Sequence, residues 1–507
     1  MTGVHCVYMA PTSPRLSPAD REFFAAIDQV VYSNPFTDER TAIVRSFVEM
    51  ATPEELATNR DREAALAMSV VAPRLEPWMD AQKRSKLAAE DSSLLRSAFF
   101  YTSYHRHVAG IDALIQQQLS SGDPPVSEGV AASVIGDFAR WGLDEELAVR
   151  MFGFFFQLRR AFYFVVVSLP GRSESMRGLR RALWDNLFTR DMRIYQDRLW
   201  NHMEDFSTLL LGETGTGKGQ AAAAIGRSQF ISYLPKKRRF ATNFTDSFIA
   251  INLAQFPETL IESELFGHRK GAFTGAIDEH QGVLELCSEQ GALFLDEIGE
   301  AGVPIQIKLL RVLQDRAFTP IGSHELRRFK GRVIAASNRP LDELRRKGGF
   351  RDDFYYRLCS DVIVVPPLRQ RIRESPEELD LLVDLLVTRT TGARSESAND
   401  RVLTALRRDL PSAYLWPGNV RELEQAVRRI MLTGRYVADA PSAAADADED
   451  FVQRVSAGTL RAEDMLGRYC ALLYRRYGTY EEVARRAALD RRTVKKYVET
   501  ARGEATP

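Results

Sequence analysis

A glycine-rich loop most constrains how this 507-residue chain can fold. The sequence GETGTGKG lies between an apolar run, Ser207–Leu211, and a segment with helical character, Gln220–Gly226. Glycines let backbone N–H groups close around phosphate oxygens, and the following helix adds positive potential at its N-terminus. The loop consists of Gly212, Glu213, Thr214, Gly215, Thr216, Gly217, Lys218 and Gly219. This strand–loop–helix context predicts a phosphate-binding loop rather than a glycine-rich turn with an incidental lysine.

Two adjacent carboxylates, Asp296 and Glu297, follow the apolar run Ala292–Leu295. Carboxylate oxygens bind Mg²⁺, so we expect Asp296 to hold the metal, directly or through water. We expect Glu297 to orient or deprotonate an attacking water molecule. Alone, such a pair is usually a strand edge with a solvated face, but the upstream loop favours an ATPase site. Gly219 stands where a Ser or Thr hydroxyl usually binds the metal.

Five short apolar runs, separated by helical or loop segments, follow the turn at Pro170-Gly171. Their arrangement predicts a parallel sheet with flanking helices. The runs are Ser207–Leu211, Phe248–Leu253, Ala292–Leu295, Arg332–Ala336 and Val362–Val365. The chain before the turn has helical signals, beginning with a Ser17 cap before Pro18. The absence of strand–helix alternation there argues against a phosphoacceptor receiver domain.

Further motifs follow the phosphate loop in a fixed order. They are ESELFGHRKGAFTGA (residues 262–276), GALFLDEIGE, VIAASN, GFRDDFYYRL, VPPLRQR and WPGNVREL. On these motifs, the region from about Gly171 to Tyr436 resembles the bacterial enhancer-binding proteins, which are AAA+ activators of sigma-54 RNA polymerase. The resemblance implies an ATPase that uses ATP and Mg²⁺ and assembles as a homo-oligomeric, hexameric ring.

The same resemblance assigns roles to individual residues. Asn338 resembles the sensor of the γ-phosphate, and Asn252 resembles the residue that holds Glu297 in an inactive orientation. Arg351 and Arg357 resemble arginine fingers donated to a neighbouring subunit, and Arg421 resembles the lid arginine that senses nucleotide. The mobile loop that contacts sigma-54 would be Gly271, Ala272, Phe273, Thr274, Gly275 and Ala276. For each arginine alone, a surface salt bridge is the simpler interpretation.

The C-terminal segment predicts a helix-turn-helix. Tyr480–Ala487 and Arg491–Thr500 have helical spacing on either side of a short turn. From residue 460 to residue 502 there are eleven basic and six acidic residues, an excess of five positive charges. The residues expected to face double-stranded DNA are Arg491, Arg492, Lys495 and Lys496. The segment resembles the Fis-type helix-turn-helix; the alternative is a basic helical hairpin that aids oligomerisation.

Composition limits where the chain can bind nucleic acid and indicates the compartment in which it works. Lys and Arg total 68, as do Asp and Glu, so any nucleic-acid surface must be local. The four cysteines, Cys6, Cys287, Cys359 and Cys470, have no metal-like spacing, which favours reduced thiols in a cytoplasmic protein. The apolar run Met151–Leu169 carries two central arginines, which favours a buried helix over a membrane span.

We therefore predict a multidomain chain with four parts. They are a helical N-terminal regulatory or sensory domain (1–167), an α/β AAA+ ATPase domain (168–436) with a helical lid (about 372–436), a flexible linker (437–455) and an all-α helix-turn-helix domain (456–507). The predicted function is sigma-54-dependent activation of transcription from upstream DNA. The alternatives are a AAA+ remodeller of another client, with the helix-turn-helix used for assembly, and a DNA-binding sensor with an inactive ATPase.

Some features depart from the family pattern. Gly219 replaces the acidic residue usually found after the lysine. The stretch Asn186–Asp205 lengthens the approach to the phosphate loop, and Phe230–Phe244 resembles an insertion. Its basic run, KKRR, is expected to lie in a solvated loop, with contact to DNA as the alternative. In the N-terminal domain, the aromatic cluster Phe152–Phe164 is expected to be helical core, with a ligand pocket as the alternative.

Overall fold

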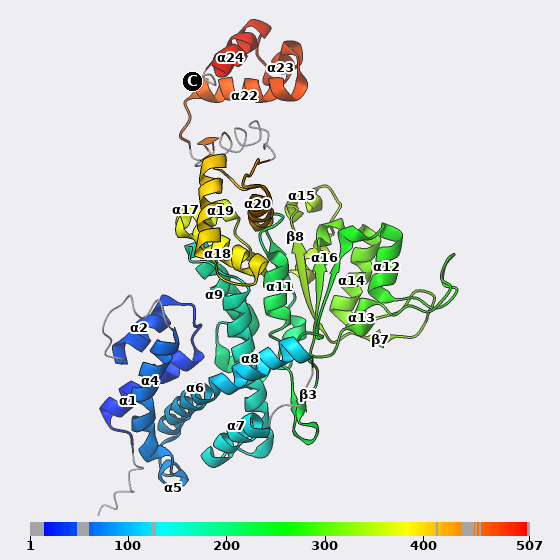
Figure 1. Cartoon of the computed structure of the whole chain (residues 1–507). Coiled ribbons are helices and arrows are strands. Elements are labelled where there is room, and N and C mark those ends of the chain that lie inside the picture. Colours follow the sequence, from blue (N-terminus) through cyan, green and yellow to red (C-terminus); the bar gives the residue numbers. More distant parts are fainter. Residues whose placement is uncertain are drawn as a thin grey trace, which may run out of the picture. The chain divides into compact units, whose positions relative to one another are not determined.

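The computed structural model describes residues 15–47, 60–122, 128–411, 414–438, 451, 454–455 and 458–503. Figure 1 shows the helices and strands. The chain divides into two compact units. One comprises Met1–Asn399 with Gly418–Gln425, and the other comprises Asp400–Pro417 with Ala426–Pro507. Most of the predicted linker, residues 437–455, lies outside the described residues.

A five-stranded parallel sheet forms the centre of the first unit. Its strands are β1 (Thr208–Leu211), β4 (Phe248–Asn252), β5 (Ala292–Asp296), β8 (Arg332–Ser337) and β9 (Asp361–Val364), in the order β4-β5-β8-β1-β9. All five predicted runs are therefore strands of one sheet, and the α/β prediction is confirmed. Because the strands are parallel, their carboxyl ends meet at one edge, where the phosphate loop follows β1.

Helices cover both faces of this sheet. On one face, α12 (Glu258–Phe266), α14 (Val303–Asp315) and α16 (Asp352–Leu358) share a core with Leu209 and Val333. On the other face, α9 (Glu174–Phe188) and α11 (Lys218–Gly226) share a core with Leu210 and Ile334. Neighbouring residues of one strand thus enter opposite cores, as the two-residue period of a strand requires.

The N-terminal region is helical, as predicted. Its helices are α1 (Pro18–Tyr32), α2 (Asp38–Phe47), α4 (Arg60–Leu75), α5 (Ala81–Arg84), α6 (Ala89–Ser121), α7 (Glu128–Trp141) and α8 (Glu145–Val167). The Ser17 side chain caps α1 by accepting a hydrogen bond from the backbone of Asp20, at 3.0 Å. The buried residues of these helices belong to the same hydrophobic cluster as α9, α11 and one sheet face.

Both segments that lengthen the domain pack against α8. The predicted insertion forms a small hairpin of β2 (Tyr233–Leu234) and β3 (Arg239–Phe240), with its basic residues exposed. The Phe240 ring stacks on Phe156 of α8, with centroids 4.2 Å apart. In the other segment, the buried hydroxyl of Tyr195 donates to Gln157 of α8 at 2.9 Å. The aromatic cluster of α8 is therefore largely core, as expected.

The lid helices are α17 (Leu368–Glu374), α18 (Glu377–Thr391), α19 (Glu396–Asp409) and α20 (Asn419–Thr433), and the C-terminal helices are α22 (Ala462–Tyr477), α23 (Tyr480–Ala487) and α24 (Arg491–Gly503). Shorter elements are α10 (Met192–Ile194), α13 (Val283–Leu286), α15 (Leu341–Arg346), β6 (Ala317–Phe318) and β7 (Arg327–Arg328). In the part of the chain that the structure describes, no helix combines the length and apolarity needed to cross a membrane.

Candidate functional site

A row of hydrogen bonds runs along the carboxyl edge of the sheet. The Asn252 amide, at the end of β4, donates to Asp296 Oδ2 at 3.2 Å. The backbone N–H of Asn338 donates to Glu297 Oε2 at 3.3 Å, and the Asn338 amide donates to Thr214 Oγ1 at 3.0 Å. The row follows the strand order from β4 to the loop after β1. The fold thus brings together the acid pair, both asparagines and the phosphate loop.

Asn252 differs in one respect from what the resemblance implied. Its amide donates to Asp296 rather than to Glu297, so in this conformation the residue that holds Glu297 is Asn338, through its backbone. Glu297 itself has a φ of 54°. Few non-glycine residues adopt this left-handed backbone conformation, and those that do are often at functional positions. This backbone turn separates the directions of the two neighbouring carboxylates.

Lys218 opens helix α11 and is almost buried. Its Nζ donates to the backbone oxygens of Gly212 and Glu213, at 2.8 and 3.1 Å. Burial lowers the pKa of Lys218, while Glu297 and Asp296 act in the opposite direction. The first N–H groups of α11 have no intrahelical acceptor, so this helix end can bind an anion alongside the ammonium group.

Gly215 shows why the loop needs glycine. Its φ is +80°, and a Cβ built there would lie 2.3 Å from the backbone oxygen of Gly418 in the lid. Gly217, with a φ of 105°, is the N-cap of α11. Any other residue would be strained at these positions and, at Gly215, would collide with the lid.

A polar latch joins the lid to the phosphate loop. Arg369 of α17 donates two hydrogen bonds to the Glu213 carboxylate, at 2.7 and 2.5 Å. The buried Asn419 amide donates to Glu213 Oε2 and to the Thr214 backbone oxygen, both at 3.1 Å. The bonds from Arg369 hold the pKa of Glu213 below its ordinary value. Sequence reasoning missed Arg369 and Asn419 as site residues; the Gly-Asn turn within WPGNVREL was the available signal.

The three predicted arginines occupy different surroundings. Arg421 lies beside the phosphate loop, since its Cβ is 3.0 Å from a Cβ built on Gly215. Arg351 precedes α16 and pairs with Asp353 at 2.7 Å, while Arg357 donates to the Leu313 backbone oxygen at 3.1 and 3.0 Å. Among the described residues, neither Arg351 nor Arg357 bonds to the phosphate loop of its own chain.

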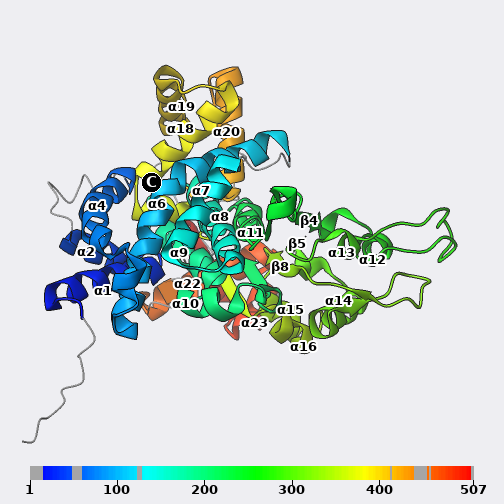
Figure 2. The same cartoon turned by 90° about the horizontal axis from the view of Figure 1, so that it is seen from below.

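The GAFTGA segment, Gly271–Ala276, forms a closed turn between α12 and α13. Gly271 N–H donates to the Ala276 oxygen at 2.8 Å, and Ala276 N–H donates to the Phe273 oxygen at 3.0 Å. The Phe273 side chain is 39% exposed and packs its edge against His268. In Figure 2, the chain between α12 and α13 and the neighbouring chain around β7 extend away from the sheet. This geometry presents an aromatic residue at an exposed turn.

Comparison with known proteins identifies the domain that carries this site. A family model described as the sigma-54 interaction domain matches residues 192–364. The regulatory protein AtoC of Escherichia coli (strain K12) is 37% identical over 275 residues, which are 52% of this chain and 55% of AtoC. The Nif-specific regulatory protein of Azotobacter vinelandii is 42% identical over 230 residues, 45% of this chain and 40% of that protein. Residues 192–364 therefore match the sigma-54 interaction domain that the family model describes.

The matches cover only part of the chain and of its relatives. This chain spans about half the length, or less, of these relatives. A solved structure of NtrX from Brucella abortus in complex with ADP covers 78% of this chain and 87% of its own, at 20% identity and a TM-score of 0.40. We draw no conclusion from a likeness that low. The N-terminal helices and the C-terminal helices both lie outside the matched residues 192–364.

The C-terminal helices form a compact three-helix group around Cys470, Val483 and Val498. Ala488, with a φ of 53°, makes the turn between α23 and α24. The Asp490 carboxylate then accepts from the backbone N–H of Arg492 at 2.8 Å, which caps α24. All four predicted DNA-facing residues are exposed on α24: Arg491, Arg492, Lys495 and Lys496. The helix predicted to read DNA thus presents its basic side chains outward.

Proposed function

We propose that this protein is an ATPase that activates sigma-54-dependent transcription. The observation that carries the proposal is the hydrogen-bonded row at the carboxyl edge of the sheet, in a domain that also exposes the GAFTGA turn. Lys218 and the N–H groups of residues 212–219 would bind the phosphates of ATP. Glu297 would orient and deprotonate the attacking water.

Asp296 would hold Mg²⁺ delivered with ATP, with Asn252 fixing the carboxylate from the side. The residues fit a metal because the carboxylate of Asp296, at the strand end, lies near the phosphate-loop lysine. Its negative charge acts to raise the pKa of Lys218. The ion neutralises charge on the phosphates. Since Gly219 offers no hydroxyl, water molecules would complete the coordination.

A ring arrangement would give the two arginines a role outside their own subunit. Neither bonds to its own phosphate loop in the described residues, so Arg351 and Arg357 fit a role at a neighbouring subunit's ATP. An arginine donated across a boundary stabilises charge that develops on the transferred phosphoryl group. We therefore propose a homo-oligomeric ring, hexameric by analogy with the family, with Asn338 and Arg421 sensing the nucleotide.

The remaining parts of the proposal concern partners. Hydrolysis would move the turn at residues 271–276 against sigma-54 RNA polymerase, and α24 would tether the ring to double-stranded DNA. Such a protein works in the cytoplasm, where the polymerase is. The proposed domains are 1–167, 168–436 and 456–507, although the N-terminal helices share a core with the ATPase domain.

The experiment is transcription from a sigma-54 promoter with purified components, comparing wild type with Thr274→Ala. We expect activation in the wild type and its loss in the variant, with ATP hydrolysis retained. Ser323→Ala removes a hydroxyl from the neighbouring loop and is the matched control. Loss of activation in the control as well would refute a specific role for the GAFTGA turn.

DNA binding has its own test. Arg492→Ala and Lys496→Ala should each weaken binding similarly across sequences and reduce the salt dependence by about one phosphate contact if they touch the backbone. Arg475→Ala, on α22, is the control. If α24 variants bind DNA as the wild type does, the helix-turn-helix serves assembly, and a AAA+ remodeller of another client becomes the better interpretation.

A further inference from the structure

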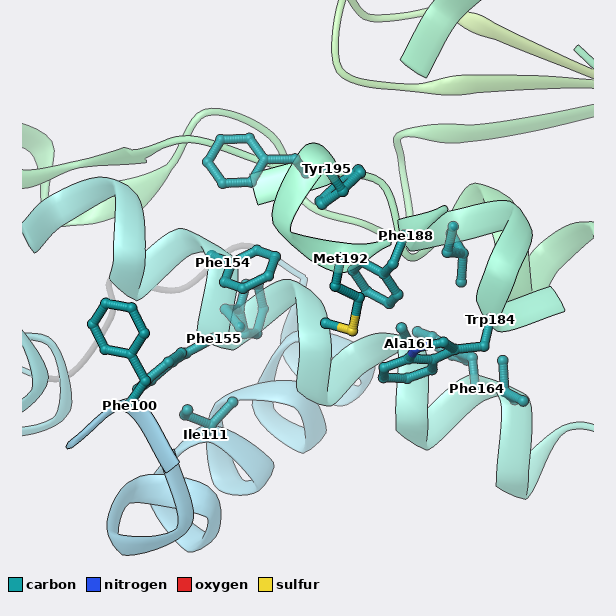
Figure 3. Packing of buried hydrophobic residues seen from close by; sticks show 14 of the residues in the cluster. Phe100, Ile111, Phe154, Phe155, Ala161, Phe164, Trp184, Phe188, Met192 and Tyr195 are labelled. Carbon is teal, nitrogen blue, oxygen red and sulfur yellow. The ribbon is translucent and has the colours of Figure 1, made fainter. Parts of the chain in front are cut away.

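The N-terminal helices border a half-open cavity of about 350 Å³. It lies against α8 and is bordered by α1, α2, α4 and α6, and by Trp184 and Met192 of the ATPase region. Figure 3 shows Phe154 and Phe155 of α8 near Phe100, with Met192 and Trp184 on the ATPase side. These five side chains all line the cavity. Its size falls within the range of small-molecule sites.

The charged groups that line the cavity are Arg40, Glu63 and Arg159, and the imidazole of His105 lines it as well. Arg40 pairs with Glu63 at 3.6 Å, which is longer than a hydrogen bond. Arg159 is held by two hydrogen bonds to Asp112, at 2.5 and 2.7 Å. Burial and the two arginines lower the pKa of His105 to about 3, so its imidazole is neutral at neutral pH. Each arginine therefore has its charge balanced by a carboxylate partner, of which Glu63 lines the cavity and Asp112 does not.

We propose that this cavity is the binding site for an uncharged, largely apolar molecule of about the size of two fused aromatic rings, bearing one hydroxyl group. The hydroxyl would accept from Arg40 and donate to Glu63, bridging the two groups from the side of the cavity, whereas a carboxylate would face Glu63. The aromatic walls would bury the rings. No catalytic residue of the ATPase lies in this cavity.

Helix α8 connects this cavity to the phosphate site. One side of α8 lines the cavity, through residues such as Phe154 and Leu158. Its other side holds the end of α11, where Arg160 donates to the backbone oxygens of Arg227 and Gln229 at 2.7 and 2.8 Å. Because Lys218 opens the same helix α11, a ligand that displaces α8 would shift the phosphate loop. This coupling rests on the proposed ATPase function; the binding site does not.

The test is calorimetric titration of the full chain with 2-naphthalenemethanol, without ATP or polymerase. We expect saturable one-to-one binding that is lost in Val108→Trp, which fills the cavity from α6. Ala113→Trp, exposed on the same helix, should bind as the wild type does. If Val108→Trp does not fold, Ala64→Phe, which enters the cavity from α4, replaces it. No binding, or equal binding by wild type and the filled variant, overturns the site.

A second arm tests the ligand class. Arg40→Met should weaken the binding of 2-naphthalenemethanol about tenfold and leave the binding of 2-ethylnaphthalene unchanged, because only the alcohol forms a hydrogen bond with the guanidinium. Arg45→Met, on the same helix, is the control. Tighter binding of 2-naphthoate than of the alcohol overturns the uncharged class.

ATP hydrolysis is then measured with and without the alcohol. Binding of the alcohol with an unchanged hydrolysis rate overturns the coupling, whereas no hydrolysis in either sample overturns the proposed ATPase function.

Discussion

The two ends of helix α11 are held in different ways. At its N-terminus, short-range sequence decides the structure, because the phosphate loop and Lys218 are consecutive residues. At its C-terminus, the backbone oxygens of Arg227, Ser228 and Gln229 accept from side chains about 70 residues away, on α8. The first end resembles its relatives, and the second lies against helices that the family model does not match.

This difference indicates that the residues expected to hydrolyse ATP and the residues that position the phosphate helix lie at different ends of α11. Residues at the sheet edge hold one another in place by hydrogen bonds and would set the rate of hydrolysis. Residues at the α8–α11 contact are buried and would set how firmly the phosphate helix is positioned. Variants at the first end should therefore change turnover with little effect on stability, whereas variants at the second should lower stability.

The largest effect should come from Glu297→Gln. Loss of the base should reduce ATP hydrolysis by more than about a hundredfold, since positioned acid–base groups contribute about 10²–10⁴-fold. ATP binding should persist, because Lys218 and the loop are intact. Steady-state phosphate release and nucleotide titration measure the two effects. Glu300→Gln, on the same segment, should hydrolyse ATP nearly as the wild type does; unchanged hydrolysis in Glu297→Gln would remove its assigned role.

Arg160→Met should have the next largest effect, on stability. Arg160 is fully buried, its burial lowers its pKa, and none of the described carboxylates forms an ion pair with it. Its loss leaves two buried backbone oxygens without their donors, which should cost on the order of 3 kcal/mol in the free energy of unfolding. Denaturant unfolding measures this cost.

The control for that experiment is Arg150→Met, also on α8, whose guanidinium lies 5.5 Å from the Trp200 ring centre. It should cost less than about 1 kcal/mol. Equal destabilisation by both variants would mean that capping of α11 is not the source of the effect, and the contrast between the two ends of the helix would fail.

The sequence predicted all five sheet strands because each lies in a local pattern. The predicted phosphate-site residues also lie in local motifs, and the fold brings them to one edge of the sheet. It did not predict that Asn252 contacts Asp296, since orientation at a strand end depends on neighbouring strands. It also did not predict the Glu213–Arg369 latch, which joins residues 156 apart. The basic run at residues 236–239 was expected to be solvated and is exposed. The stacking of Phe240 on α8 was not predicted; only the aromatic residues of the segment hinted at that contact.

Asn338→Ala should sharpen the comparison at the catalytic end. The substitution removes the bond from its amide to Thr214 but keeps the backbone bond to Glu297. We expect roughly a tenfold lower hydrolysis rate, equivalent to one hydrogen bond, with an unfolding free energy close to that of the wild type. Asn201→Ala, an exposed asparagine before β1, is the control. A loss of stability comparable with that of Arg160→Met would contradict the separation of the two ends.

The smallest effect should be the pH dependence of the lid latch. Arg369 holds the pKa of Glu213 below its ordinary value of 4.5, so the latch stabilises the fold above that pH and the stabilisation is lost as pH falls through the lowered pKa. The Glu213 side chain is 42% exposed, so solvent screening limits the contribution to less than about 1 kcal/mol.

The measurement compares wild type with Glu213→Gln in denaturant unfolding at pH 7 and at pH 3.5. The difference between the two proteins should be present at pH 7 and smaller at pH 3.5; a constant difference would show that the charge of Glu213 does not hold the lid. Glu343→Gln, on α15 and away from the lid contacts, is the control.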